Sequence, residues 1–121
     1  MEMYASGPGD GLDSGAALAR VGGDADLLKE ISRIFIDDCP RAMAELQDAA
    51  ARRDCSLLER AAHGLKGAAS NFGASSVVAA ALHLEKMGRS GTFEGFAHAL
   101  QEFEKALSAL RDELEALIAS Q

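Results

Sequence analysis

The last quarter of the chain places an apolar residue at every fourth or third position in strict alternation. The members of this repeat are Phe96, Leu100, Phe103, Leu107, Leu110, Leu114 and Leu117. A repeat of about 3.5 residues keeps all of them on one face of a single long helix. Such a face packs against other helices at a shallow left-handed angle, which predicts a helical bundle.

Helical patterns also precede this segment. A short apolar stretch covers residues 12–21, and Asp24 then takes the N-cap position of a helix expected over residues 24–38. Pro40 suits the first turn of a new helix, because the N–H that proline lacks would be unpaired there anyway. We expect this next helix to end near Arg53.

Two more helices are expected, over residues 54–73 and 77–87, with a glycine-containing turn at residues 88–91. No alternating strand pattern competes with them. The sequence therefore predicts an all-α fold, an antiparallel four-helix bundle with a short additional N-terminal helix, over residues 12–121. Residues 1–11 are rich in glycine and are expected to form a flexible tail or linker.

Composition narrows the classes of partner. The 121 residues include 19 Asp and Glu against 12 Lys and Arg, a formal net charge of −7, which argues against nucleic acid and anionic membranes as partners. No apolar run approaches the roughly 20 residues that a membrane span needs. Cys39 and Cys55 form no metal or redox motif, so we expect free thiols in a reducing cytoplasm and no metal site.

One histidine stands out on the helix expected over residues 54–73. A wheel drawn at about 100° per residue centres the apolar face near Leu65 and puts His63 about 160° away, facing water. The residues on the same side as His63 are Glu59, Lys66, Gly67 and Ser70.

This set of side chains suits phosphoryl chemistry. An exposed imidazole titrates at about pH 6.5, so a large share of such side chains is neutral in the cytosol. A neutral imidazole has a nitrogen lone pair able to attack phosphorus. Lys66 can neutralise part of the phosphoryl charge, while Ser70 or water donates a hydrogen bond. Gly64 and Gly67 each cost roughly 1 kcal/mol within a helix. Gly67 either opens space for another molecule beside His63 or allows close packing between helices.

The run over residues 62–74 (AHGLKGAASNFGA) resembles the motif of histidine-containing phosphotransfer (Hpt) domains of bacterial phosphorelays, and the similarity extends over residues 12–118. It implies that His63 is the phosphoacceptor, through Nε2, and that Lys66 lies beside the phosphoryl group. The implied docking face for a receiver domain comprises Glu59, Arg60, Gly64, Gly67, Ser70 and Asn71. Gly64 departs from the family pattern, which more often has Thr, Ser or Ala there.

The resemblance also implies the partners. Response-regulator receiver domains would supply an aspartyl phosphate and Mg²⁺, and a hybrid histidine kinase would stand upstream. The chain has no GxxxxGK[ST] loop or nucleotide-binding glycine motif, so we expect no cofactor of its own and no autonomous kinase activity. We expect a monomer. The sequence leaves open whether this is a stand-alone protein or the C-terminal domain of a hybrid sensor kinase.

Three other classes of protein share features with this motif. The dimerising histidine domain of sensor kinases has an acidic residue and Arg-Thr-Pro after its histidine, whereas Gly64, Leu65 and Lys66 follow here, which excludes that class. The phosphotransfer domain of chemotaxis kinases has nearly the same motif and stays open. A helical module that binds a receiver domain or an enzyme without phosphoryl transfer also stays open.

Overall fold

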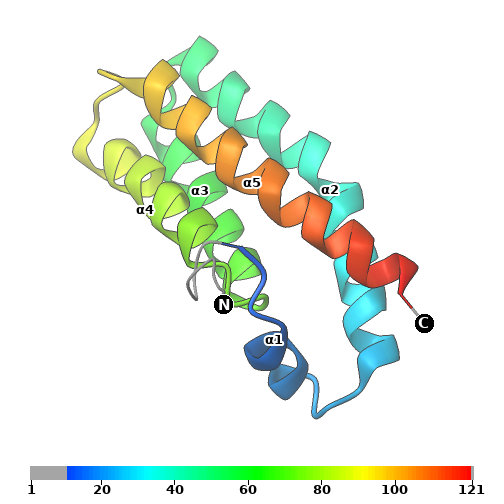
Figure 1. Ribbon diagram of the computed structural model, residues 1–121. Coiled ribbons are helices and arrows are strands. Elements are labelled where there is room, and N and C mark those ends of the chain that lie inside the picture. Colours follow the sequence, from blue (N-terminus) through cyan, green and yellow to red (C-terminus); the bar gives the residue numbers. More distant parts are fainter. Residues whose placement is uncertain (1–10, 121) are drawn as a thin grey trace.

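The computed structural model describes residues 11–120, which form five helices: α1 (Ser14–Arg20), α2 (Ala25–Arg52), α3 (Cys55–Ser70), α4 (Ser75–Ser90) and α5 (Phe96–Ala119). Helices α2 to α5 run side by side along one long axis, and α1 lies at one end of the bundle (Figure 1). This arrangement confirms the predicted all-α four-helix bundle with an additional N-terminal helix. The tail predicted for residues 1–11 lies, apart from Gly11, outside the described residues.

The four long helices enclose one core. Helix α2 packs against α3 and α5, and α4 packs against the same two helices from the opposite side. The largest fully buried side chains are Phe72, Phe103, Leu46, Leu58, Leu84, Leu110, Leu114 and Val77. Phe72 meets Phe35 of α2 edge to face, with ring centroids 5.1 Å apart. The regular apolar stripe of α5 is buried from Leu100 to Leu114 as its spacing predicted, and Phe96 and Leu117 at its two ends are partly buried against the core.

Helix α2 differs from the sequence prediction at Pro40. The predicted break is wrong, because one helix runs from Ala25 to Arg52 with Pro40 exposed in its interior. An interior proline costs a helix about 3 kcal/mol. The buried stripe nevertheless crosses it without a change of register, through Leu28, Phe35, Cys39, Ala42 and Leu46. Burial of this stripe as one continuous surface outweighs the local cost of the proline.

Helix α4 is longer than the sequence suggested. The turn expected at residues 88–91 begins only at Gly91, which closes the helix in the left-handed conformation with φ of 75°. Gly88 is helical and buried, and a Cβ added to it would lie 2.6 Å from the backbone N of Glu59 and 2.7 Å from the carbonyl O of Cys55. Gly88 therefore lets the backbones of α3 and α4 approach closely.

Helix α1 is tied to the turn between α3 and α4. The Asp13 side chain caps α1 by accepting a hydrogen bond from the Ala16 N–H, and the Asp13 N–H donates to the Phe72 carbonyl at 2.9 Å. Ala17 is fully buried. Across residues 11–120, every helix is too short or too polar to traverse a lipid bilayer.

Candidate functional site

His63 lies in the middle of α3 on the face turned away from the core. Its side chain is 67% exposed, whereas Leu58, Ala62, Leu65 and Ala69 of the same helix are buried. The wheel prediction that His63 faces water is thus confirmed. Asp54 starts this helix as its N-cap, accepting a hydrogen bond from the Leu57 N–H at 3.0 Å.

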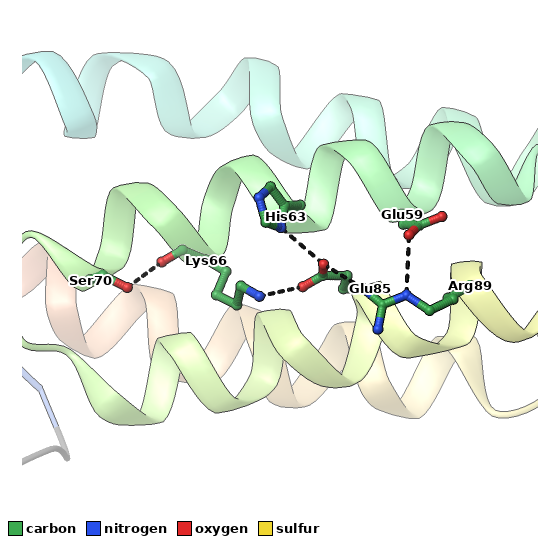
Figure 2. Close-up of polar contacts among 6 residues, drawn as sticks. All are labelled: Glu59, His63, Lys66, Ser70, Glu85 and Arg89. Carbon is green, nitrogen blue, oxygen red and sulfur yellow. Dashed lines mark hydrogen bonds and ion pairs between the residues drawn. The ribbon is translucent and has the colours of Figure 1, made fainter.

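A buried carboxylate from α4 holds the ring of His63. The Nδ1 atom of His63 lies 2.9 Å from Oε2 of Glu85, whose side chain is only 4% exposed. Figure 2 shows the second ring nitrogen pointing away from Glu85. The exposed side of the imidazole is therefore its Nε2 side, while Nδ1 is in contact with the protein.

Two cations share the same carboxylate. The Lys66 Nζ lies 2.8 Å from Oε1 of Glu85, and an Arg89 Nη lies 2.9 Å from Oε2 (Figure 2). The Lys66 contact is an ion pair by distance rather than an aligned hydrogen bond, since Oε1 has no hydrogen-bond partner among the described residues. Arg89 also reaches Glu59 of α3, with its Nε 3.2 Å from Oε2. The cluster thus contains two cations, two carboxylates and one imidazole.

The surroundings of Glu85 favour its ionised form. The neighbouring Lys66 ammonium holds the pKa of the Glu85 carboxyl below its ordinary value, although burial acts in the opposite direction. The hydrogen bond with His63 contributes to the same lowering. Glu85 is consequently a carboxylate at neutral pH, and it accepts rather than donates its hydrogen bonds.

The helical glycines of α3 face open space. A Cβ added at Gly64 or Gly67 would meet no atom within 4 Å, other than the adjoining residues and the backbone of their own helix. Close packing between helices therefore does not explain either glycine. Gly88 of α4 fills that role instead. Of the two explanations for Gly67, the structure supports the one in which it leaves the surface beside His63 bare.

Two of the remaining predicted docking residues donate side-chain hydrogen bonds to the backbone of their own helix. The Ser70 hydroxyl donates to the Lys66 carbonyl at 2.8 Å, and the Arg60 Nε donates to the Ser56 carbonyl at 3.3 Å. Asn71 is exposed at the C-cap of α3. The Ser70 hydroxyl thus already donates its proton to the backbone of its own helix.

Shallow grooves run between α2 and α3 beside this face. Arg60 and Gly64 line one groove together with Asp38 and Arg41 of α2. Asn71 lines the next groove with Ile31 and Ile34, and the other residues there are Phe35, Asp37, Asp38, Ala68 and Phe72.

Two large apolar side chains of α2 lie outside the core. Ile34 is 60% exposed, and Leu27, two turns earlier, is 44% exposed. Ile34 lies about 100° from Phe35, which takes the inward position, so α2 carries an apolar flank outside the core. Ile36, on the other side of Phe35, is half-buried against the core.

Sequence reasoning missed Glu85 and Arg89. Arg89 fell in the expected turn, and a wheel of one helix cannot show which residue of another helix faces it. One signal was present: Glu85 occupies the buried stripe of α4, with Ala81 four residues before it and Gly88 three residues after it. A charged residue at a stripe position is rarely buried without a partner, so it marks a polar site within the bundle.

Comparisons with known proteins agree with this geometry. The family model of the Hpt domain matches residues 30–120. Among solved structures, the chain resembles histidine-containing phosphotransfer protein B of Pseudomonas aeruginosa PAO1, with 22% identity, a TM-score of 0.82, and coverage of 92% of this chain and 95% of that one. No curated protein matches the sequence. The family match covers most of the chain, and the chain belongs to the Hpt domain family, whose members carry phosphoryl groups on a histidine in phosphorelays.

Proposed function

We propose that His63 is the phosphoacceptor and that it reacts through Nε2. It would accept the phosphoryl group from the aspartyl phosphate of one receiver domain and pass it to the aspartate of another. The observation that carries this assignment is the exposed imidazole, whose Nδ1 lies 2.9 Å from the buried Glu85 carboxylate while its other nitrogen points away. An attacking nitrogen has to be both unprotonated and accessible, and Nε2 is the ring atom on the exposed side.

Lys66 is proposed to stabilise the phosphoryl group on His63. It lies three residues further along α3, and its ammonium group already stands in the same cluster, 2.8 Å from Glu85. A phosphoryl group brings up to two negative charges to the surface beside this ammonium. The flexible stem of lysine allows the charge to turn towards the phosphoryl oxygens, where it offsets the charge that builds up during transfer.

The docking face for a receiver domain is proposed along α3 and the adjoining side of α2. Glu59, Arg60, Gly64, Gly67, Ser70 and Asn71 form its α3 part. Gly64 and Gly67 leave space for a close approach, since nothing lies within 4 Å of their would-be side chains. The exposed Ile34 and the groove between it and Asn71 extend the face with apolar surface.

The remaining chemistry is proposed to come from the partner. Phosphoryl transfer needs a cation to offset charge on the moving group, and we propose that Mg²⁺ is held by the receiver domain and not by this chain. A hybrid histidine kinase would stand at the head of the relay. We further propose a cytoplasmic monomer, a setting consistent with the free thiols of Cys39 and Cys55.

The test is phosphate uptake by the purified chain from a phosphorylated cognate receiver domain. The native chain should take up acid-labile, base-stable phosphate, and His63→Gln should take up none while keeping its helical content, because the ring lies outside the core. His83→Gln, at another exposed histidine, is the matched control and should behave as native. Labelling that persists in His63→Gln would refute the assignment. Tight binding of the receiver without any phosphate uptake would identify a pure interaction module instead.

A further inference from the structure

Arg60 is a cation of the proposed docking face that its surroundings leave without a counter-charge. It is exposed on α3, three residues before His63. Within residues 11–120 its guanidinium forms no ion pair, and its one hydrogen bond runs from Nε to the Ser56 carbonyl at 3.3 Å. The donors on its two Nη atoms are therefore available to another molecule.

The cations on the α4 side of His63 are already neutralised. Figure 2 shows Lys66 and Arg89 turned towards Glu85, and their nitrogens lie 2.8 and 2.9 Å from its oxygens. Arg89 also lies 3.2 Å from an oxygen of Glu59. Two cations thus face two carboxylates, and this side of His63 presents no net charge to a partner.

The cation on the α2 side is bound as well. Arg41 contacts both oxygens of Asp38 at 2.8 Å, through Nε and one Nη, and its other Nη lies 2.7 Å from Glu45. One cation faces two carboxylates there, so this group is negative. Among the described residues of the docking face and its α2 border, Arg60 thus supplies the positive charge that no carboxylate offsets.

Gly64 gives a partner access to Arg60. It lies one turn further along α3, about 40° around the helix from Arg60, and its outer side is open. The groove that both residues line has a volume of about 190 Å³, below the range of about 300–1,000 Å³ typical of small-molecule sites. Its floor includes the buried Phe35 and Leu65. The groove fits a single side chain, and its apolar floor strengthens an ion pair formed there.

A receiver domain would approach this face with negative charge. Mg²⁺ prefers carboxylate oxygens, so a partner that holds it beside a phosphoacceptor aspartate has acidic residues there. The net charge of −7 on this chain repels such a partner at long range. We propose that Arg60 is a specificity-determining residue, which binds an acidic side chain from the rim of the receiver's site as that side chain lies over Gly64. This inference rests on the proposed function.

The first measurement is the affinity for the Mg²⁺-bound, unphosphorylated form of a receiver domain that phosphorylates the native chain. By calorimetry, Arg60→Gln should bind about tenfold more weakly at about 50 mM salt. The ratio of the two Kd values should fall at least about twofold at about 500 mM salt, because salt screens an exposed ion pair. Arg60→Lys keeps the charge but lacks the planar fork, so it should lie between the two chains.

Lys105→Gln is the matched control. It removes the same charge at an exposed position of α5, which lies across the bundle from α3, and it should bind like the native chain. Gly64→Thr tests access to Arg60, because the added side chain would stand in the groove. It should weaken binding as Arg60→Gln does, and native affinity in Gly64→Thr would contradict the proposed path of the partner's side chain.

A charge exchange tests the chemistry of the partner. Arg60→Glu should weaken binding more than Arg60→Gln, because it places two like charges together. Each Asp and Glu around the receiver's phosphoacceptor is then replaced by Lys in turn. One of these receivers should recover at least about half of the binding free energy that Arg60→Glu loses, and the same receiver should bind the native chain more weakly. Recovery by none of them would overturn the proposal.

Phosphoramidate separates this inference from the proposed function, since this small phosphoryl donor needs no docking face. Uptake on His63 of the native chain is followed by ³¹P NMR while ammonia leaves from the donor. If the native chain takes up phosphate, native affinity in Arg60→Gln, or a loss that salt does not change, would overturn the role of Arg60 alone. A native chain that takes up none from either donor would refute the proposed function, and this inference with it. If Arg60→Gln lost its helical content, Arg60→Lys and the charge exchange would decide.

Discussion

His63 and Glu85 come from different helices and differ sharply in exposure, at 67% and 4% of their side-chain surfaces, yet Nδ1 and Oε2 lie 2.9 Å apart. The contact crosses the interface between α3 and α4 (Figure 2). A partner protein can therefore reach the ring without reaching the carboxylate that holds it. The orientation of the ring depends on the packing of the bundle, while the ring itself is exposed to solvent.

Lys66→Ala should slow transfer from a phosphorylated receiver domain roughly tenfold, because it removes the cation that we propose stabilises the phosphoryl group. The loss is smaller than at a fully enclosed site, since the lysine side chain is 27% exposed and solvent screens its charge. Rapid-quench transfer assays give the rate, and calorimetry gives receiver affinity, which should stay nearly native. Lys86→Ala, at an exposed lysine of α4, is the control. Loss of receiver binding in Lys66→Ala would contradict the assigned role.

Gly67→Leu should block transfer from a receiver domain but leave uptake from phosphoramidate largely intact. The added side chain projects into the open space beside His63 that belongs to the proposed docking face, whereas a small donor does not need that whole space. The same two donors assayed in parallel separate docking from chemistry. Gly67→Ala, the smaller substitution, should lie between the native chain and Gly67→Leu. Unimpaired transfer from the receiver in Gly67→Leu would disprove the steric argument.

Gly88→Ala should destabilise the fold, whereas Gly64→Ala should stabilise it. A Cβ at Gly88 would lie 2.6 Å from the Glu59 backbone N, so α3 and α4 would have to separate. Overpacking of this kind costs about 1–3 kcal/mol, of which better helix propensity returns about 1. Gly64 faces open space, so alanine there should add roughly 1 kcal/mol of stability. Urea unfolding followed by circular dichroism measures the free energy of unfolding of both variants. Equal changes in the two variants would contradict the difference in packing between Gly88 and Gly64.

The native chain should lose stability as pH falls below about 4.3, the ordinary titration range of a glutamate. Since the pKa of the folded Glu85 carboxyl is lowered, its contribution to the free energy of unfolding is complete above that range and disappears as pH falls through the lowered pKa. Protonation would leave Lys66 and Arg89 without their counter-charge. Urea midpoints between about pH 7 and pH 3 should decline less in Glu85→Gln than in the native chain.

A control removes the effect of other carboxyl groups from that profile. Arg41 lowers the pKa of Asp38 through a hydrogen bond, so Asp38 adds a similar dependence on pH. Asp38 is present in both chains, and the difference between the two profiles isolates Glu85. Parallel profiles for the native chain and Glu85→Gln would show that the ionisation of Glu85 is not linked to folding.

Local patterns predicted most of the fold. The repeat from Phe96 to Leu117 and the cap at Asp24 correspond to helices in the structure, and a wheel of one helix placed His63 on the surface. These features depend on residues within one or two turns of each other, which the sequence displays directly. Pro40 misled the prediction because its local cost is visible in the sequence, whereas the core contacts that outweigh it form only in the folded bundle.

The sequence predicted only the part of the site that lies on one helix, because contacts between helices form only in the folded bundle. His63, Lys66 and Gly67 share one helix, and their spacing places them together. Glu85 lies 22 residues from His63, and their contact depends on how α3 and α4 are aligned. That alignment is set by packing across the interface rather than by any local pattern. The one local trace of this contact is a charged residue, Glu85, at a position of the apolar stripe of α4.

Gly88 bears on the geometry of the candidate site as well as on the fold. It lies one turn from Glu85 on α4, and the backbone it touches at Glu59 lies one turn from His63 on α3. The two helices therefore meet beside the reacting pair and determine how far the carboxylate has to reach. A larger residue at this position would separate α3 from α4 and lengthen the contact between His63 and Glu85. A glycine that does not touch His63 thus helps to hold its ring in place.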